Sequence, residues 1–174
     1  LDRAGAAGLR AIVRPGPHAN AELTRFGFPE RLFRVPAILA RNARDTAALL
    51  PVPPRAFACP SYASETFQAE VAIWYRAVAA VLVPRLAPAG PVIAVQVDNE
   101  MSYFFRTALY DLDYSEGALA EYRAFVRARR STEGEIEPPR RFDATTPEGL
   151  PRHLEWAEFK EMHLAGSLRR LRRR

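Results

Sequence analysis

The stretch that decides the fold is Gly90-Pro91-Val92-Ile93-Ala94-Val95-Gln96-Val97-Asp98-Asn99-Glu100. Its apolar run is rich in β-branched residues and follows a turn of proline and glycine, so it predicts a buried strand. Continuous apolarity is typical of a parallel strand that is covered on both faces. The amide and the two acids then lie at the carboxyl end of the strand, where α/β folds place ligands and catalytic groups.

Two interpretations of Glu100 are open from this stretch alone. A carboxylate at the end of a parallel strand can serve as a general acid or base. A glutamate in the same place can also cap the next helix or pair with one of the many arginines, because structural ion pairs are common at such positions.

Length and composition predict one globular domain. The chain has 174 residues, of which 48% are hydrophobic and 26% charged, which is enough for a real core. The net charge of +5 and the sequence pI of about 9.9 raise the question of nucleic-acid binding. Much of the excess lies in the tail at 169–174, which favours a solvated helix end, so no nucleic-acid partner is expected.

The single cysteine, Cys59, excludes an intrachain disulfide and leaves the redox compartment open. No apolar run approaches the roughly 18–20 residues of a membrane helix, so no membrane partner is expected. The sequence starts at Leu1 without an initiator methionine, and we interpret it as a piece of a longer protein whose targeting signals lie elsewhere.

The order of elements predicts an α/β fold. We expect a helix end at 1–8, a strand at 9–13 that stops at the 14–18 turn, short helices at 30–39 and 40–50 broken at 51–54, a helix at 65–87, a strand at 92–97, a helix at 115–130, a loop at 131–151 and a final helix from 152. Strands that alternate with helices form parallel βαβ units, and two such consecutive strands are usually neighbours. Two strands cannot close a sheet, so much of their apolar surface should face partners that this sequence lacks.

Apolar residues recur at helical spacing in two of these segments and predict packed faces. The 65–87 helix is expected to bury Phe67, Val71, Trp74, Val78, Val81 and Leu82. Ser64 is expected to cap the start of this helix, and Ser115 the start of the next one. The final helix is expected to bury Leu154, Phe159, Met162, Leu168 and Leu171.

Polar residues follow both predicted strands. The first strand is followed by Arg14, His18, Asn20 and Glu22, and the second ends at Gln96, Asp98, Asn99 and Glu100. Neighbouring parallel strands open at the same edge of a sheet, so these side chains should share one pocket. Acids and amides bond hydroxyl groups, and nearby aromatic rings pack on sugar C–H surfaces, so the pocket suits a polyhydroxylated ligand.

Other chemistries fit less well. No glycine-rich loop opens a helix after a strand, so phosphate binding is not predicted. The histidines show no metal-ligand spacing with each other or with Cys59, and no Gly-x-Ser-x-Gly elbow occurs. We therefore expect neither a metal nor a cofactor.

Three motifs resemble glycoside hydrolase family 35 β-galactosidases. The segment 14–22, RPGPHANAE, resembles the family's RPGPY-x-x-AE, and 26–29, FGFP, resembles its Gly-Gly-Leu-Pro step. The segment 90–100 resembles GPIIAVQVENEYG. The similarity is clear over roughly residues 8–104, and the region after about 115 is more weakly similar, also to family 42 galactosidases.

The resemblance implies a (β/α)8 TIM barrel, of which residues 1–174 would be a fragment of the catalytic domain. They would span roughly the third and fourth β/α units with a long loop insertion. It also implies hydrolysis of terminal non-reducing β-D-galactosides with retention. Glu100 would be the acid/base and Asn99 would bond the sugar 2-hydroxyl. Glu22 would bind hydroxyls of the terminal sugar, and the same pocket would be bordered by His18, Ala19, Asn20 and Ala21.

Retention requires a second carboxylate about 5–5.5 Å from Glu100 as the nucleophile, and this sequence offers no candidate. The piece alone should therefore be inactive. His18, Leu23 and Met101 replace aromatic residues of the family pattern, which makes the sugar identity less certain than β-glycoside hydrolysis. A β-glycosidase of other specificity and a non-catalytic carbohydrate-binding barrel stay as alternatives, and a basic nucleic-acid module rests on the tail alone.

Overall fold

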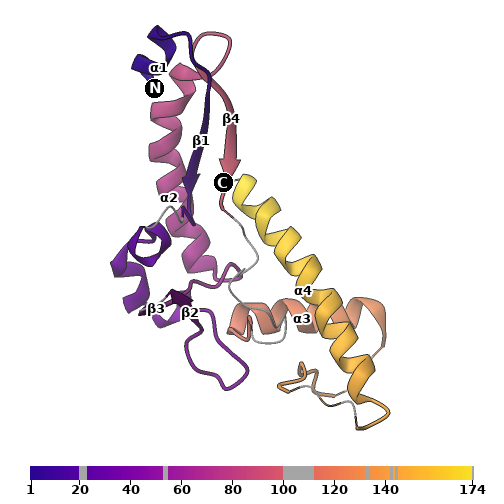
Figure 1. Ribbon diagram of the computed structural model, residues 1–174. Coiled ribbons are helices and arrows are strands. Elements are labelled where there is room, and N and C mark those ends of the chain that lie inside the picture. Colours follow the sequence, from indigo (N-terminus) through magenta and orange to yellow (C-terminus); the bar gives the residue numbers. More distant parts are fainter. Residues whose placement is uncertain are drawn as a thin grey trace.

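The computed structural model describes residues 1–19, 23–52, 55–99, 112–131, 134–141, 143 and 145–173. In chain order, the elements are α1 (Asp2–Ala6), β1 (Ala11–Gly16), η1 (Thr24–Gly27), η2 (Glu30–Arg34), η3 (Pro36–Ile38), β2 (Leu49–Val52), β3 (Arg55–Ala58), α2 (Glu65–Leu82), η4 (Val83–Arg85), β4 (Val92–Val97), α3 (Glu116–Arg129) and α4 (Gly149–Arg172). The strands β1 and β4 lie beside α2, and α3 and α4 pack against each other in a second part of the molecule (Figure 1).

The two strands expected to be neighbours do pair. β1 and β4 form a parallel two-stranded sheet in which Ile12 lies opposite Ala94 and Gly16 opposite Val97. The connection between them runs through α2, as the alternation of strand and helix predicts. Figure 1 shows both arrows pointing the same way along α2, so the carboxyl ends of the two strands share one edge.

β1 is longer than expected, because it continues through the proline and glycine that were predicted to end it. The pairing shifts register between Val13 and Gly16, and Gly16 has a φ of +92°, a conformation that a glycine adopts without strain. Pro15 lies within this shift, so its missing N–H interrupts no regular ladder. Its carbonyl accepts a bond of 2.8 Å from Trp74 Nε1 instead.

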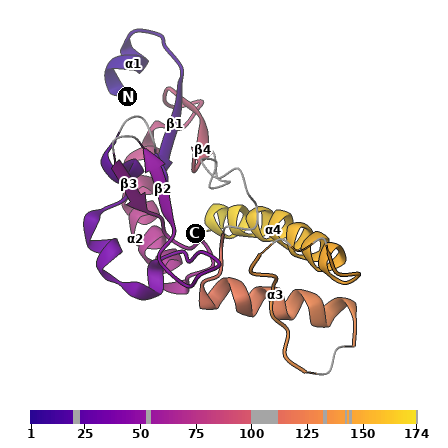
Figure 2. The same cartoon turned by 60° about the horizontal axis from the view of Figure 1, so that its bottom comes forward.

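The long connection after β1 differs most from the expectation. The short helix expected at 30–39 is present as the 3₁₀ helices η2 and η3, whereas the segment at 40–50 forms no helix and ends in an antiparallel hairpin, in which β2 pairs with β3 and Pro51 lies opposite Ala56. Pro51, which was expected to break a helix, therefore lies in a hairpin strand. Figure 2 shows this hairpin on the same side of the molecule as α2, apart from α3.

The hydrophobic core lies mainly in this connection and not between α2 and the sheet. One buried cluster joins it to α2 and the end of α4, through Phe26, Phe28, Leu32, Ile38, Ala40, Ala48, Leu50, Cys59, Tyr62, Phe67, Val71, Leu112 and Leu171. A second cluster joins α3 to α4, through Tyr114, Tyr122, Val126, Ile136, Trp156 and Phe159. The FGFP motif at 26–29 anchors the first cluster, because both of its phenylalanines are buried.

α2 begins where its sequence predicts, since the Ser64 side chain accepts the Phe67 N–H. Phe67, Val71 and Leu82 are buried as expected, but Trp74 is 49% and Val81 53% exposed. Together with η4, the stretch Glu65–Arg85 has 21 residues and is long and apolar enough to cross a membrane, judged by length and composition. This differs from the expectation that no apolar run of that length occurs. A core helix meets the same two conditions.

α4 begins three residues before the expected start and buries a different face. Phe159 and Leu171 are in the core, but Leu154, Met162 and Leu168 are exposed. The helix instead buries a polar row of His153, Lys160, His163 and Ser167. The partner elements α3 and the 112–115 segment carry acids and hydroxyls, so the polar row faces groups that can bond it.

The faces of the β1–β4 sheet are open in the described part of the chain. Ile93 is 54% and Val95 42% exposed. The apolar run predicts burial on both faces of the strand, and the described residues do not provide it. This exposure agrees with the expectation that two strands leave apolar surface uncovered.

Candidate functional site

The parallel pairing brings the two predicted polar clusters to one edge. The Asp98 N–H donates to the Gly16 carbonyl at 2.9 Å, directly beyond the last strand pair. Residues 14–19 and 96–99 therefore face each other although about eighty positions separate them in the chain. The bond from the His18 N–H to Asp98 Oδ1, between residues 80 positions apart, shows the same. The expectation that both strands end at the same place is confirmed for the described residues.

Arg14 and Asn99 form the direct side-chain contact between the two motifs. Arg14 Nη1 donates to Asn99 Oδ1 at 2.5 Å, and Asn99 is buried. A guanidinium only donates, so it fixes the amide with its oxygen toward Arg14 and its nitrogen away from it. Asn99 is thereby left with N–H groups that can donate to a hydroxyl oxygen of a ligand.

Asp98, the residue before Asn99, is buried and only 1% exposed. Its carboxylate accepts the His18 N–H at 2.6 Å and the Tyr62 hydroxyl at 2.8 Å. Burial raises the pKa of Asp98 to about 6, and the bonds from His18, Tyr62 and Asn99 oppose that rise. Its φ of +63° is left-handed, a region that aspartate tolerates better than most residues.

The Tyr75 hydroxyl completes this edge from α2 by donating to the Gly16 carbonyl at 2.6 Å. Burial and the charge of Asp98 both raise the pKa of Tyr75 above its ordinary value. The hydroxyl therefore stays protonated and acts as a fixed donor. Neither Asp98 nor Tyr75 was assigned a definite role from the sequence, and the only signal for Asp98 was its place before Asn99.

His18 was predicted to border the sugar site. Its ring is 6% exposed and lies edge-on to Phe26, with centroids 5.0 Å apart, and stacked on Phe28 at 5.8 Å. The ring thus packs in the aromatic cluster, and its backbone N–H is the group that meets Asp98. A substrate contact by the imidazole stays a prediction.

The remaining predicted site residues, Glu100, Glu22, Asn20 and Ala21, lie outside the described residues. The two ends of the 20–22 segment are held by one residue: Ala19 N–H donates to the Phe26 carbonyl and Phe26 N–H to the Leu23 carbonyl, both at 2.9 Å. The chain therefore enters and leaves this segment next to the end of β1.

An apolar groove of about 520 Å³ adjoins the edge on the side of α2. Arg14 and Pro15 line it from β1, Phe28 from the turn, and Trp74 from α2. Trp74, expected in the core, is thus an exposed wall of this groove.

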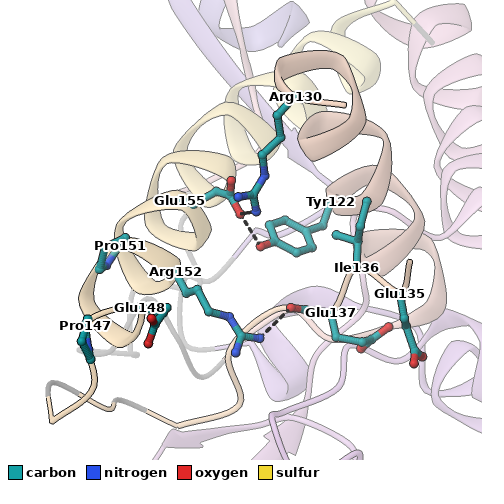
Figure 3. A pocket seen from close by; sticks show the side chains of 10 residues that line it. All are labelled: Tyr122, Arg130, Glu135, Ile136, Glu137, Pro147, Glu148, Pro151, Arg152 and Glu155. Atoms are coloured by element: carbon teal, nitrogen blue, oxygen red, sulfur yellow. Dashed lines mark hydrogen bonds and ion pairs between the residues drawn. The ribbon is translucent and has the colours of Figure 1, made fainter. Parts of the chain in front are cut away.

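A larger cavity of about 650 Å³ lies between α3, the 134–148 region and the first turns of α4. Figure 3 shows Arg130 and Tyr122 reaching toward Glu155, and Arg152 reaching toward the backbone of Glu137. Tyr122 and Arg130 both reach Glu155, at 3.0 and 3.2 Å, and Arg152 donates to the Glu137 carbonyl. These bonds join lining residues to one another, and we assign no chemistry to the cavity.

The described part of the chain holds no group of three or more histidine, cysteine, aspartate or glutamate side chains arranged to bind a metal ion. The chemistry this edge can offer is hydrogen bonding to hydroxyls by Asn99 and Arg14, next to the position from which Glu100 follows.

No family model matches the chain. It is similar to the exo-β-D-glucosaminidase of Pyrococcus horikoshii, with 29% identity over 98% of this chain and 23% of that protein. It is also similar to the exo-β-D-glucosaminidase of Thermococcus kodakarensis, with 30% identity over 92% of this chain and 22% of that protein. The chain thus spans less than a quarter of the length of the curated relatives it matches. The similarity supports a relation to glycosidases in general and does not single out family 35 β-galactosidases.

Proposed function

We propose that the chain is part of the catalytic barrel of a retaining β-glycosidase and carries its acid/base, Glu100. The observation that carries the proposal is the Arg14–Asn99 bond across the ends of β1 and β4. It joins the two motifs whose resemblance suggested a glycosidase. The similarity to two glycosidases supports the same class of reaction.

In this mechanism Glu100 protonates the glycosidic oxygen as the bond to the sugar breaks, because an alkoxide is a poor leaving group. A carboxylate elsewhere in the barrel attacks the sugar and forms a covalent glycosyl-enzyme. Glu100 then acts as base toward the water that releases the sugar. Asn99, oriented by Arg14, donates to the sugar 2-substituent, and contacts there strengthen in the transition state.

Two sugars are supported by different observations. The names of both curated relatives favour a terminal β-D-glucosamine residue. The motifs at 14–22 and 90–100 favour a terminal β-D-galactose residue, although His18, Leu23 and Met101 depart from that pattern. We place glucosaminide first, because the similarity to the relatives extends over nearly the whole chain.

The test compares the complete protein with its Glu100→Gln variant on 4-nitrophenyl β-D-glucosaminide and β-D-galactoside. We expect hydrolysis of one of them, and a loss of about a hundredfold or more in the variant on glycosides with poor leaving groups. Sodium azide should partly restore turnover of the activated substrate by the variant, with a β-glycosyl azide as product, since azide attacks the glycosyl-enzyme without a base. The matched control is Glu116→Gln, an exposed residue of α3, which should keep the wild-type rate.

Wild-type turnover by Glu100→Gln on poor leaving groups would exclude the assignment. Sugar binding without hydrolysis by the complete protein would favour the alternative of a non-catalytic carbohydrate-binding barrel.

A further inference from the structure

Asp98 connects three separate segments at the end of β4. Its carboxylate holds the His18 N–H, which follows β1, and the Tyr62 hydroxyl, which precedes α2. Its own N–H donates to the Gly16 carbonyl, the same oxygen that Tyr75 of α2 meets. Asp98 therefore joins the end of β1, the loop after it and the segment before α2 through both its backbone and its side chain.

We propose that Asp98 is the positioning residue of this site, which sets the direction in which the chain presents Asn99 and Glu100. The inference rests on the proposed function. Asp98 would not touch the sugar; it would act by fixing the backbone turn from which the next two residues project.

The backbone geometry supports this role. Asp98 has a φ of +63°, so the chain leaves the extended path of β4 at this residue. Asn99 comes next and meets Arg14 across the strand ends. If the turn at Asp98 relaxed toward an extended conformation, the Asn99 amide, which directly precedes Glu100 in the sequence, would be carried away from Arg14.

A role in holding the turn alone would not explain why residue 98 is an aspartate. An isolated carboxyl group in an apolar interior is costly, and burial here raises its pKa to about 6. An asparagine would adopt the same left-handed turn without this cost. What the carboxylate adds is acceptance of two donors at once, the His18 N–H and the Tyr62 hydroxyl, which ties the loop after β1 to the catalytic strand.

The experiment uses Asp98→Asn in the complete protein. The amide keeps the shape and one acceptor, but its NH₂ group faces the other donor. We expect kcat/KM, which reports the glycosylation step, to fall by about tenfold to a hundredfold on a phenyl glycoside, whose departure needs a proton, and clearly less on a dinitrophenyl glycoside, whose departure does not.

The matched control is Asp113→Asn. Asp113 is also a buried carboxylate that accepts a backbone N–H, from Arg41, and a hydroxyl, from Ser61, but it precedes α3. The Asp113→Asn variant should lose about as much in thermal midpoint as Asp98→Asn does. Its rate should depend on the leaving group as the wild-type rate does. Tyr62→Phe, which removes one donor only, should give a smaller loss in the same sense as Asp98→Asn, and it carries the test if Asp98→Asn does not fold.

Equal leaving-group dependence in the Asp98→Asn, Asp113→Asn and wild-type proteins would overturn the inference. If Asp98→Asn does not fold, a leaving-group dependence in Tyr62→Phe equal to that of the wild type would overturn the inference. Wild-type and Glu100→Gln proteins are measured beside them. An inactive wild type, or a fully active Glu100→Gln variant, removes the proposed function and the inference with it, whereas an impaired Glu100→Gln beside a normal Asp98→Asn removes the inference alone.

Discussion

At the scale of single residues, Lys160 is the least expected feature. The only lysine of the chain lies fully inside the α3–α4 contact, with its Nζ 5.4 Å from the centre of the Trp156 ring. Its Nζ has no hydrogen-bond partner in the described part of the chain. Burial lowers the pKa of Lys160 to about 8, and the nearby charges of Asp113 and Glu121 oppose this change.

Lys160→Met should stabilise the protein near neutral pH. The amine has a higher pKa in the unfolded chain, about 10.4, so between pH 8 and that value the unfolded chain binds more protons and stability rises with pH. Below pH 8 the folded state carries the whole cost of the buried charge. We expect the variant to gain about 1–3 kcal/mol of unfolding free energy at pH 7, and the gain to shrink as the pH approaches 10.

Thermal unfolding between pH 6 and 10 checks this expectation. Lys160→Arg is the control, because it stays charged throughout and should lose stability at every pH. A lower midpoint for Lys160→Met across the whole range would show that attraction to Asp113 and Glu121 outweighs the cost of burial.

At the scale of elements, helix starts are the best-predicted features. Ser64 and Ser115 were read as caps from sequence, and their hydroxyls accept the Phe67 and Ala118 N–H groups at 3.2 and 3.5 Å. A cap depends on residues only three positions apart, so it can be read locally. The β2–β3 hairpin and the end of β1 depend on pairing between strands, Leu49 with Ala58 and Gly16 with Val97, and their expected forms were wrong.

Ser64→Ala should lower the unfolding free energy by about 0.5–2 kcal/mol, because α2 loses its N-cap. The Ser64 hydroxyl also donates to the Ala37 carbonyl at 2.7 Å, which places the expected loss in the upper part of that range. Denaturant unfolding measures the difference. Ser64→Thr keeps the hydroxyl and should lie close to wild type, so equal losses in both variants would argue against the cap as the cause.

At the scale of the whole molecule, apolar surface is the dominant feature. Large exposed side chains occur on both strands and on α2 and α4, among them Ile12, Ile93, Ile73, Trp74 and Leu154. Where such side chains form contiguous patches, they mark contact surfaces or aggregation-prone surfaces. The relatives that the chain matches are about four times its length, which agrees with surfaces that other parts of a barrel would cover.

The isolated 174-residue chain is therefore expected to bind an apolar fluorescent dye, to associate as its concentration rises, and to show no glycosidase turnover. Light scattering and dye fluorescence measure the first two. Ile93→Lys and Val81→Lys, both at exposed positions, should reduce association without lowering the thermal midpoint. A monomer without dye binding at every concentration would contradict the expectation.

The sequence predicted a substantial part of the site and of the fold around it. The parallel neighbours β1 and β4, the connecting helix and the meeting of Arg14 with Asn99 at one edge are in place. The barrel and the roles of Glu100 and Glu22 stay proposals. The apolar face of α4 was wrongly predicted at Leu154, Met162 and Leu168, because periodicity cannot say whether the neighbouring elements are apolar or polar.

What the sequence determined by itself is local or periodic: the strand at 92–97, the two serine caps, and the placement of polar residues directly after strands. The tertiary structure alone decided that Asp98 lies buried between His18 and Tyr62, and that Lys160 lies inside a helix contact. Burial and hydrogen bonding of a side chain depend on groups from distant segments, and no spacing along the chain reports which of those groups it will meet.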